Sequence, residues 1–188
     1  MQAEHGGWTL SDASRFAELC LPHLDSAYNL ARWLTRDTQD AQDVVQDACV
    51  RALKYVGSLH GNDGRAWFLT IVRNAFYDWL ARNRPAEVVH DENDTVDAAA
   101  DLATPGPEQV ALRNAELRVL GDALAALPAQ YREVLVLREL EELSYKEIAS
   151  IADIPIGTVM SRLARARVML QRSPVLYAIG GRTARSAP

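Results

Sequence analysis

The stretch that decides the fold is "LSYKEIASIADIPIGTVMSRLARAR", residues 143–167. Ser144 followed three residues later by Glu147 is a capping box, which predicts that a helix begins at Tyr145. The apolar pattern of this short helix breaks just before Pro155, which is well placed in the first turn of a second helix. Two helices joined by a tight turn form a helix-turn-helix, the motif that places its second helix in the major groove of DNA.

The second helix separates into two faces when its residues are plotted at about 100° per residue. An apolar face, which we expect to pack inward, consists of Val159, Leu163, Ala166 and Leu170. The opposite face carries small hydrogen-bonding side chains and arginines, namely Thr158, Ser161, Arg162 and Arg165. Arginine binds guanine edges or phosphates, whereas a carboxylate would repel the DNA backbone, and residues 154–172 contain four arginines and no acid. We therefore expect this face to contact DNA; a solvated basic face on a bundle helix is the alternative.

The negative charge of the chain, formally −5 in total, is concentrated in its middle. Residues 1–84 hold nine bases and ten acids, residues 85–108 hold seven acids and no Lys or Arg, and residues 109–188 hold eleven bases and eight acids. The acidic segment lacks periodicity and contains Pro-Gly-Pro near its end, which indicates a flexible linker. The predicted division is an N-terminal domain at 10–84, an acidic linker at 85–107, a C-terminal domain at 108–172 and a tail at 173–188.

Both domains are predicted to be small and all-α. Apolar residues recur at three- and four-residue intervals, and the sequence lacks alternating strand patterns and hairpin dipeptides. In the N-terminal domain the pattern predicts a helix that ends near Val56, a turn-rich stretch at 57–65, and a helix from about Ala66 to Asn83. With 48% hydrophobic and 24% charged residues, the composition is normal for a soluble globular protein.

The sequence offers no site for enzyme chemistry. It has no Gly-rich phosphate loop, metal-ligand spacing or nucleophile motif, and its four histidines are scattered, so we expect no catalytic residue, metal, cofactor or small-molecule substrate. No apolar run approaches the ~20 residues of a membrane helix, and the N-terminus has no signal-peptide pattern, so we expect a cytoplasmic location. Cys20 and Cys49 are expected to be buried free thiols, with redox sensing as the alternative.

Two segments of the N-terminal domain combine charge with a helical pattern. Residues 66–84, "AWFLTIVRNAFYDWLARNR", mix five aromatic side chains with arginines, a combination that suits unstacked bases of single-stranded nucleic acid but that more often marks a core. In "DAQDVVQDACVRAL", residues 40–53, the side chains of Asp43, Gln46 and Asp47 share one face. A solvated surface is the default explanation for that face.

Taken together, these segments resemble the extracytoplasmic-function (ECF) group of bacterial RNA polymerase sigma factors. The resemblance covers about residues 10–172 in the family's order and spacing. It implies that Asp43, Gln46 and Asp47 dock on the clamp helices of the largest polymerase subunit. The late helix would recognise the −35 promoter element through Thr158, Ser161, Arg162 and Arg165. Met160 departs from the lysine that the family often has, so one backbone contact is in doubt.

The resemblance also assigns roles within residues 66–84. Arg73, Asn74 and Asp78 would lie near the non-template strand of the −10 element, whereas Trp67 and Trp79 would pack the domain. The implied function is to bind core RNA polymerase and direct promoter-specific initiation, under the control of an anti-sigma factor that is membrane-anchored in many cases. The alternatives are a stand-alone helix-turn-helix regulator, which would bind duplex DNA without polymerase, and an enzyme.

Overall fold

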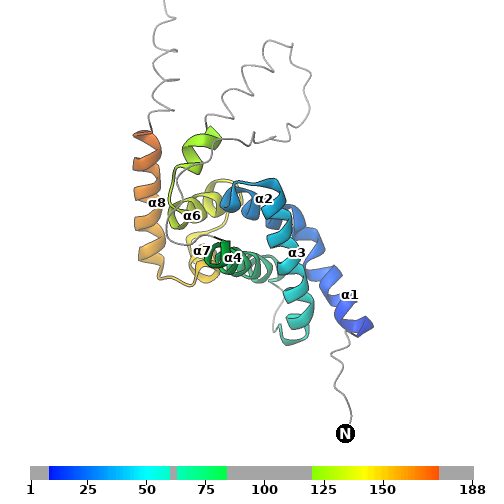
Figure 1. The fold of residues 1–188 in the computed structure, drawn as a ribbon. Coiled ribbons are helices and arrows are strands. Elements are labelled where there is room, and N and C mark those ends of the chain that lie inside the picture. The colour runs from blue at the N-terminus through cyan, green and yellow to red at the C-terminus, as the bar shows by residue number, and fades with distance from the viewer. Residues whose placement is uncertain (1–8, 60–62, 84–119, 174–188) are drawn as a thin grey trace, which may run out of the picture.

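The computed structural model describes residues 9–59, 63–83 and 120–173, and every regular element in those residues is helical (Figure 1). The N-terminal unit consists of α1 (Leu10–Leu19), η1 (Leu21–His23), α2 (Leu24–Thr35), α3 (Thr38–Tyr55), η2 (Val56–Ser58) and α4 (Gly64–Asn83). The C-terminal unit consists of a helical stretch at 120–125, α6 (Ala129–Glu139), α7 (Tyr145–Ala152) and α8 (Ile156–Gln171). The all-α prediction is confirmed for these residues, while the predicted linker and the tail beyond residue 173 lie outside them. None of the described helices is long and apolar enough to cross a bilayer.

Helices α2, α3 and α4 pack against one another and build the core of the N-terminal unit. The packed face of α3 carries four buried small residues, Ala41, Val44, Ala48 and Ala52. Small side chains let the neighbouring helices approach closely, and α4 fills the remaining space with Phe68 and Phe76. Full burial of each such large side chain stabilises the fold by about 1.5–3 kcal/mol. The opposite face of α3 is exposed to solvent at Asp43 and Gln46.

The start of α4 is fixed by a close contact with α1. A Cβ atom on Gly64 would lie 2.4 Å from the backbone oxygen of Leu19, so no larger residue fits there without a shift of the backbone. The side chain of Asp63 accepts a hydrogen bond from the Ala66 amide at 3.0 Å. The helix therefore begins at Gly64, two residues before the start that the sequence predicted.

The helix-turn-helix is present as the sequence predicted. Glu147 Oε2 accepts from the Ser144 amide at 2.7 Å, and Ser144 Oγ accepts from the Glu147 amide at 3.3 Å, which completes the capping box of α7. Asp153 ends α7 in the left-handed conformation, with φ of 52°. Pro155 is the N-cap of α8, one position before the first turn in which the sequence placed it. The inward face is confirmed, since Val159, Leu163 and Ala166 are buried and Leu170 is partly buried.

The two units pack together, which the sequence did not predict. Helix α2 contacts α6 and helix α4 contacts α7 (Figure 1). One cluster of buried apolar side chains includes residues of both units. At the centre of this contact the buried guanidinium of Arg132, on α6, donates to the carbonyl oxygens of Trp33 and Leu34, each at 3.0 Å. These carbonyls belong to the last turn of α2, where helix geometry leaves oxygens without intrahelical partners. Arg132 therefore caps a helix of the other unit.

Candidate promoter and polymerase interfaces

The late helix α8 presents the side chains that the sequence assigned to DNA. Ser161 and Arg165 are exposed, while Thr158 and Arg162 are half-buried. The Ser161 hydroxyl donates to the Thr158 carbonyl at 3.0 Å, so it is held against the helix backbone. Met160 is also exposed. Ser161 and Arg165 thus present a hydroxyl and a guanidinium to solvent on a helix that contains no acidic residue.

Arg162, half-buried on α8, interacts electrostatically with Tyr77 of α4. Burial raises the pKa of Tyr77 and the neighbouring carboxylate of Glu133 raises it further, whereas Arg73 and Arg162 act in the opposite direction. The hydroxyl of Tyr77 donates to Glu133 Oε2 at 2.8 Å. An arginine of the helix assigned to the −35 element therefore acts electrostatically on a side chain of the helix assigned to the −10 element.

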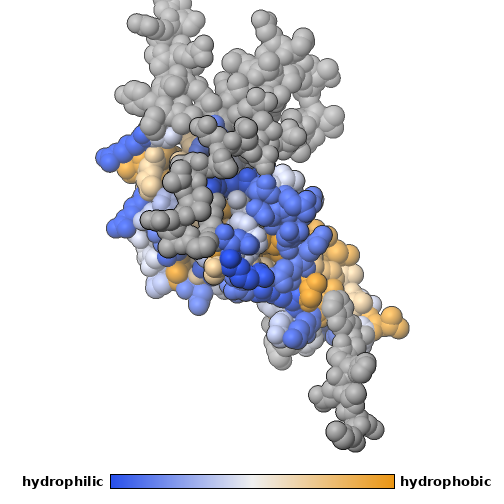
Figure 2. All heavy atoms as spheres, viewed as in Figure 1, coloured by the Kyte–Doolittle hydropathy of each residue, from blue (hydrophilic) through white to orange (hydrophobic). Residues whose placement is uncertain are grey.

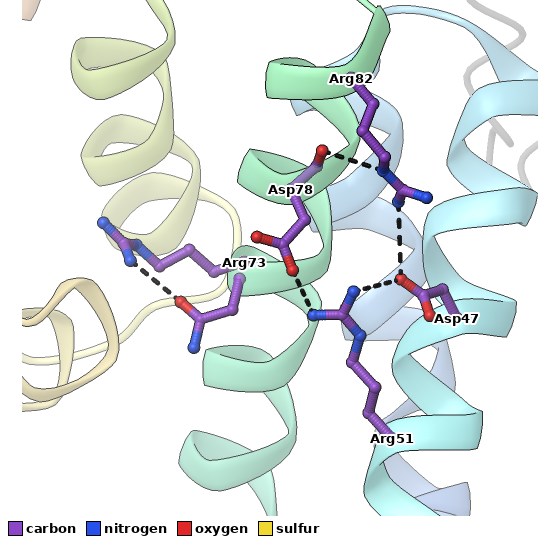
Figure 3. Close-up of polar contacts among 6 residues, drawn as sticks. Asp47, Arg51, Arg73, Asp78 and Arg82 are labelled. Carbon is purple, nitrogen blue, oxygen red and sulfur yellow. Dashed lines mark hydrogen bonds and ion pairs between the residues drawn. The ribbon is translucent and has the colours of Figure 1, made fainter.

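The three residues assigned to the −10 element point in different directions along α4. The Arg73 side chain, only 18% exposed, turns toward α6, where its Nε donates to the completely buried carboxylate of Glu133. Its guanidinium lies 4.7 Å from the centre of the Tyr77 ring and also donates to Asn74 Oδ1 at 3.2 Å. Asn74 itself is exposed. The Asp78 side chain points away from this contact, toward α3 (Figure 3).

Asp78 belongs to a cluster of two acids and two arginines, which we call the α3–α4 charge cluster: Asp47, Arg51, Asp78 and Arg82. Arg51 Nη2 lies 2.7 Å from Asp47 Oδ2, and Arg51 Nη1 lies 2.5 Å from Asp78 Oδ2 (Figure 3). Arg82 Nε donates to the Asp78 carbonyl at 3.1 Å, and its Nη2 lies 4.0 Å from Asp47 Oδ2. The pKa of Arg51 is raised, most strongly by the hydrogen bond with Asp78. One guanidinium thus joins two helices through two carboxylates.

Comparison with known proteins identifies the family. The family model described as Sigma-70 region 2 matches residues 19–85, and that described as Sigma-70, region 4 matches residues 117–170. The chain is 32% identical over 148 residues to the ECF RNA polymerase sigma-E factor of Haemophilus influenzae, an alignment that covers 76% of this chain and 77% of that protein. The chain belongs to the ECF sigma factors. It is therefore a DNA-binding factor of transcription initiation and not an enzyme.

Other relatives of this sigma factor agree with that assignment. It is 32% identical over 156 residues to ECF RNA polymerase sigma factor SigE of Mycolicibacterium smegmatis, where the alignment covers 82% of this chain but only 59% of that longer protein. Among solved structures it resembles the sigma factor RpoE of Bartonella quintana, determined with the anti-sigma factor NepR, with a TM-score of 0.64 and 26% identity. That match covers 89% of this chain and 98% of the other.

The two matched regions correspond to the two units of this sigma factor. Region 2 contains α2, α3 and α4, and region 4 contains the helix-turn-helix. Asp43 and Gln46 are exposed on α3, and Figure 2 shows hydrophilic residues over this part of the surface. Trp67 and Trp79 are partly buried against the core, which confirms the packing role that the sequence analysis gave them.

Sequence reasoning missed several residues that shape these interfaces. Arg51 lies one helical turn after Asp47, so the i,i+4 spacing of an acid and a base was a visible signal. Glu133 gave no signal, because its partners Tyr77 and Arg73 lie 56 and 60 positions earlier in the chain. The same holds for Arg65, which donates to Glu141 Oε2 at 2.9 Å across 76 positions.

Burial determines the chemistry of the two cysteines. Cys20 is a completely buried free thiol, as predicted, and burial raises its pKa to about 12. Cys49 is also free and half-buried, and burial raises its pKa as well. Since the thiolate is the reactive form, both sites disfavour redox chemistry. Within the described ranges, no group of three His, Cys, Asp or Glu residues is placed to hold a metal ion.

Proposed function

We propose that this sigma factor recognises the −35 promoter element through the exposed side of α8. The observation that carries the proposal is the division of α8 into a buried apolar face and an exposed face without acids. Ser161 and Arg165 lie on that face and would contact base edges or phosphates, flanked by Thr158 and Arg162. A guanidinium reaches guanine O6 and N7 as a bidentate donor, so Arg165 is suited to direct recognition.

We propose that α4 recognises the −10 element with Arg73, Asn74 and Asp78. Asn74 and Asp78 are exposed and can meet an unpaired base, the amide as donor or acceptor and the carboxylate as acceptor. Arg73 is held by Glu133, so it can reach DNA only after the contact between the two units has been broken. Promoter recognition would therefore require the two units to separate.

Docking on core polymerase is assigned to α3. Asp43 and Gln46 project from the solvent side of this helix, and Asp47 stands one turn further along. Their acidic and amide groups suit a basic partner surface, for which we propose the clamp helices of the largest subunit. We place the protein in the cytoplasm, where that polymerase is found. We also propose control by an anti-sigma factor, membrane-anchored or not, because the sigma factor RpoE that shares this fold was determined with such a partner.

Two experiments test these assignments. The tagged protein should retain core polymerase in a pull-down and direct transcription from promoters mapped by transcript starts after its overproduction. Asp43→Arg should abolish retention, because like charges placed across an interface cost several kcal/mol. Glu18→Arg makes the same charge change at an exposed position of α1 and serves as the matched control. Duplex binding without polymerase, together with no retention of polymerase, would instead support a stand-alone regulator.

A further inference from the structure

The α3–α4 charge cluster connects two surfaces with different proposed roles. Asp47 belongs to the surface assigned to polymerase docking, and Asp78 belongs to the helix assigned to the −10 element. The Arg51 side chain, 31% exposed, is hydrogen-bonded to both carboxylates at once. We propose that Arg51 is a positioning residue that couples polymerase docking at Asp47 to recognition of the −10 element at Asp78. The inference rests on the proposed function of these two acids.

The coupling arises because the carboxylates of Asp47 and Asp78 share the guanidinium of Arg51. Asp47 has two cationic neighbours, Arg51 at 2.7 Å and Arg82 at 4.0 Å, whereas the Asp78 carboxylate forms an ion pair with Arg51. A basic side chain of polymerase that binds Asp47 would compete with Arg51 for the same oxygen atoms. The hold of Asp47 on Arg51 then weakens, and the guanidinium is left to interact with Asp78.

The consequence for DNA lies in the charge and orientation of Asp78. An unbalanced carboxylate on an exposed helix face repels the phosphates of a nearby strand. Arg51 offsets that charge, and it engages Oδ2, which leaves Oδ1 to accept from an amino group on a base edge. The Asp78 side chain is 56% exposed, so a base can reach it. A docked polymerase would thus strengthen −10 binding through Arg51.

A purely structural role for Arg51, as a brace between α3 and α4, makes a different prediction. Removal of such a brace would lower the stability of the fold and the affinity for every partner together. The effects of substitutions at Asp47 and Asp78 on DNA affinity would then be independent of each other. The distinguishing quantity is the interaction between substitutions at the two acids, measured as a double-mutant cycle.

The experiment compares Asp47→Asn, Asp78→Asn and the double variant, each with Arg51 or with Arg51→Gln. The holoenzyme is assembled at saturating core polymerase. The probe is a fluorescent single-stranded DNA that carries the −10 element of a promoter mapped by transcript starts, and its affinity is measured by anisotropy. With Arg51 present, the change in −10 affinity of the double variant should differ about threefold from the product of the two single changes. A coupling of this size lies in the range measured for exposed ion pairs. With Arg51→Gln, the effects should be additive, and −10 affinity should fall about fivefold.

A matched control removes a neighbouring charge without breaking either ion pair of Arg51. Arg82→Gln deletes a guanidinium whose side chain is 66% exposed, so the threefold deviation should persist in this background. Additive effects with Arg51 present would overturn the inference, as would equal losses of thermal stability, core affinity and DNA affinity in Arg51→Gln. If Asp47→Asn leaves core binding unchanged and Asp78→Asn leaves DNA binding unchanged, the proposed function of these acids fails and this inference fails with it. Normal single effects with an additive cycle refute the inference alone.

Discussion

Replacement of Glu133 by alanine should destabilise the protein by about 3 kcal/mol. The Glu133 carboxylate is completely buried in α6 and accepts hydrogen bonds from Arg73 and from the Tyr77 hydroxyl. Breaking a buried ion pair typically costs about 3–5 kcal/mol, but the Arg73 side chain is 18% exposed and regains some hydration, which reduces the effect. The hydroxyl of Tyr77 also loses its acceptor, which costs about 1–3 kcal/mol where water cannot replace it. These contributions overlap because they share one carboxylate.

The assay is thermal denaturation followed by circular dichroism at the helix band. For a chain of this size, about 3 kcal/mol lowers Tm by about 6–12 °C. Glu139→Ala is the matched control, since Glu139 lies on the same helix and pairs with Arg167 at 2.7 Å, with both side chains about half exposed. An exposed pair of this kind contributes about 0.2–1 kcal/mol, so Tm should fall by no more than about 4 °C.

A second variant keeps the experiment decisive if Glu133→Ala does not fold. Glu133→Gln preserves the shape of the side chain and an acceptor for Tyr77 but removes the charge that Arg73 binds. Its Tm should lie between those of Glu133→Ala and the unsubstituted protein. If both variants melt within about 2 °C of the unsubstituted protein, the contact between α4 and α6 contributes nothing to stability, and the reasoning is refuted.

Four further predictions test other features of the structure. If the Arg165 guanidinium contacts guanine, Arg165→Ala should weaken binding to the −35 element by about 1–3 kcal/mol and relax the base preference at one base pair. A uniform loss of affinity for all sequences in competition binding would instead indicate a phosphate contact. Ser144→Ala should lower the free energy of unfolding by about 1 kcal/mol in urea titrations, through loss of the α7 cap. Hydrogen bonds from Ser144 lower the pKa of Glu147 below 4.5. The stability contributed by the ionised Glu147 carboxylate is therefore complete above that pH and is lost as the pH falls through the folded-state pKa. If the urea midpoint of Glu147→Gln fell in parallel with that of the unsubstituted protein below pH 4.5, this expectation would be contradicted. Cys20, whose pKa burial raises to about 12, should react with iodoacetamide at pH 8 far more slowly in the folded protein than in urea, and equal rates would show that its burial is wrong.

The sequence predicted best what depends on neighbouring residues. The capping box at Ser144, the end of α7 before Pro155 and the inward face of α8 all follow from local spacing, and the structure confirms them. The contact between the units could not be predicted in this way. Arg132 donates to carbonyls 98 and 99 positions earlier in the chain, and backbone oxygens carry no residue-specific signal.

The same limit applies to the site. Periodicity placed Arg73, Asn74 and Asp78 on one helix but could not show that Arg73 turns toward α6 while Asp78 turns toward α3. These directions depend on the neighbouring helices, and Glu133 and Arg51 provide the charges that select them. Local pattern therefore identifies a polar helix, whereas tertiary packing decides which of its polar groups remain available.

The cap that Arg132 forms on α2 holds the two units together, and this affects how strongly DNA can bind. Both partners in the contact belong to one chain, so closure is an intramolecular equilibrium and dilution does not open it. A ligand that needs Arg73 must bind the open form, and its apparent affinity is reduced by the fraction of molecules that are open. A first ligand that holds the units apart removes this reduction for the second. The DNA contacts made by α4 and those made by α8 would then be cooperative, even though the two sets of contacts share no atoms.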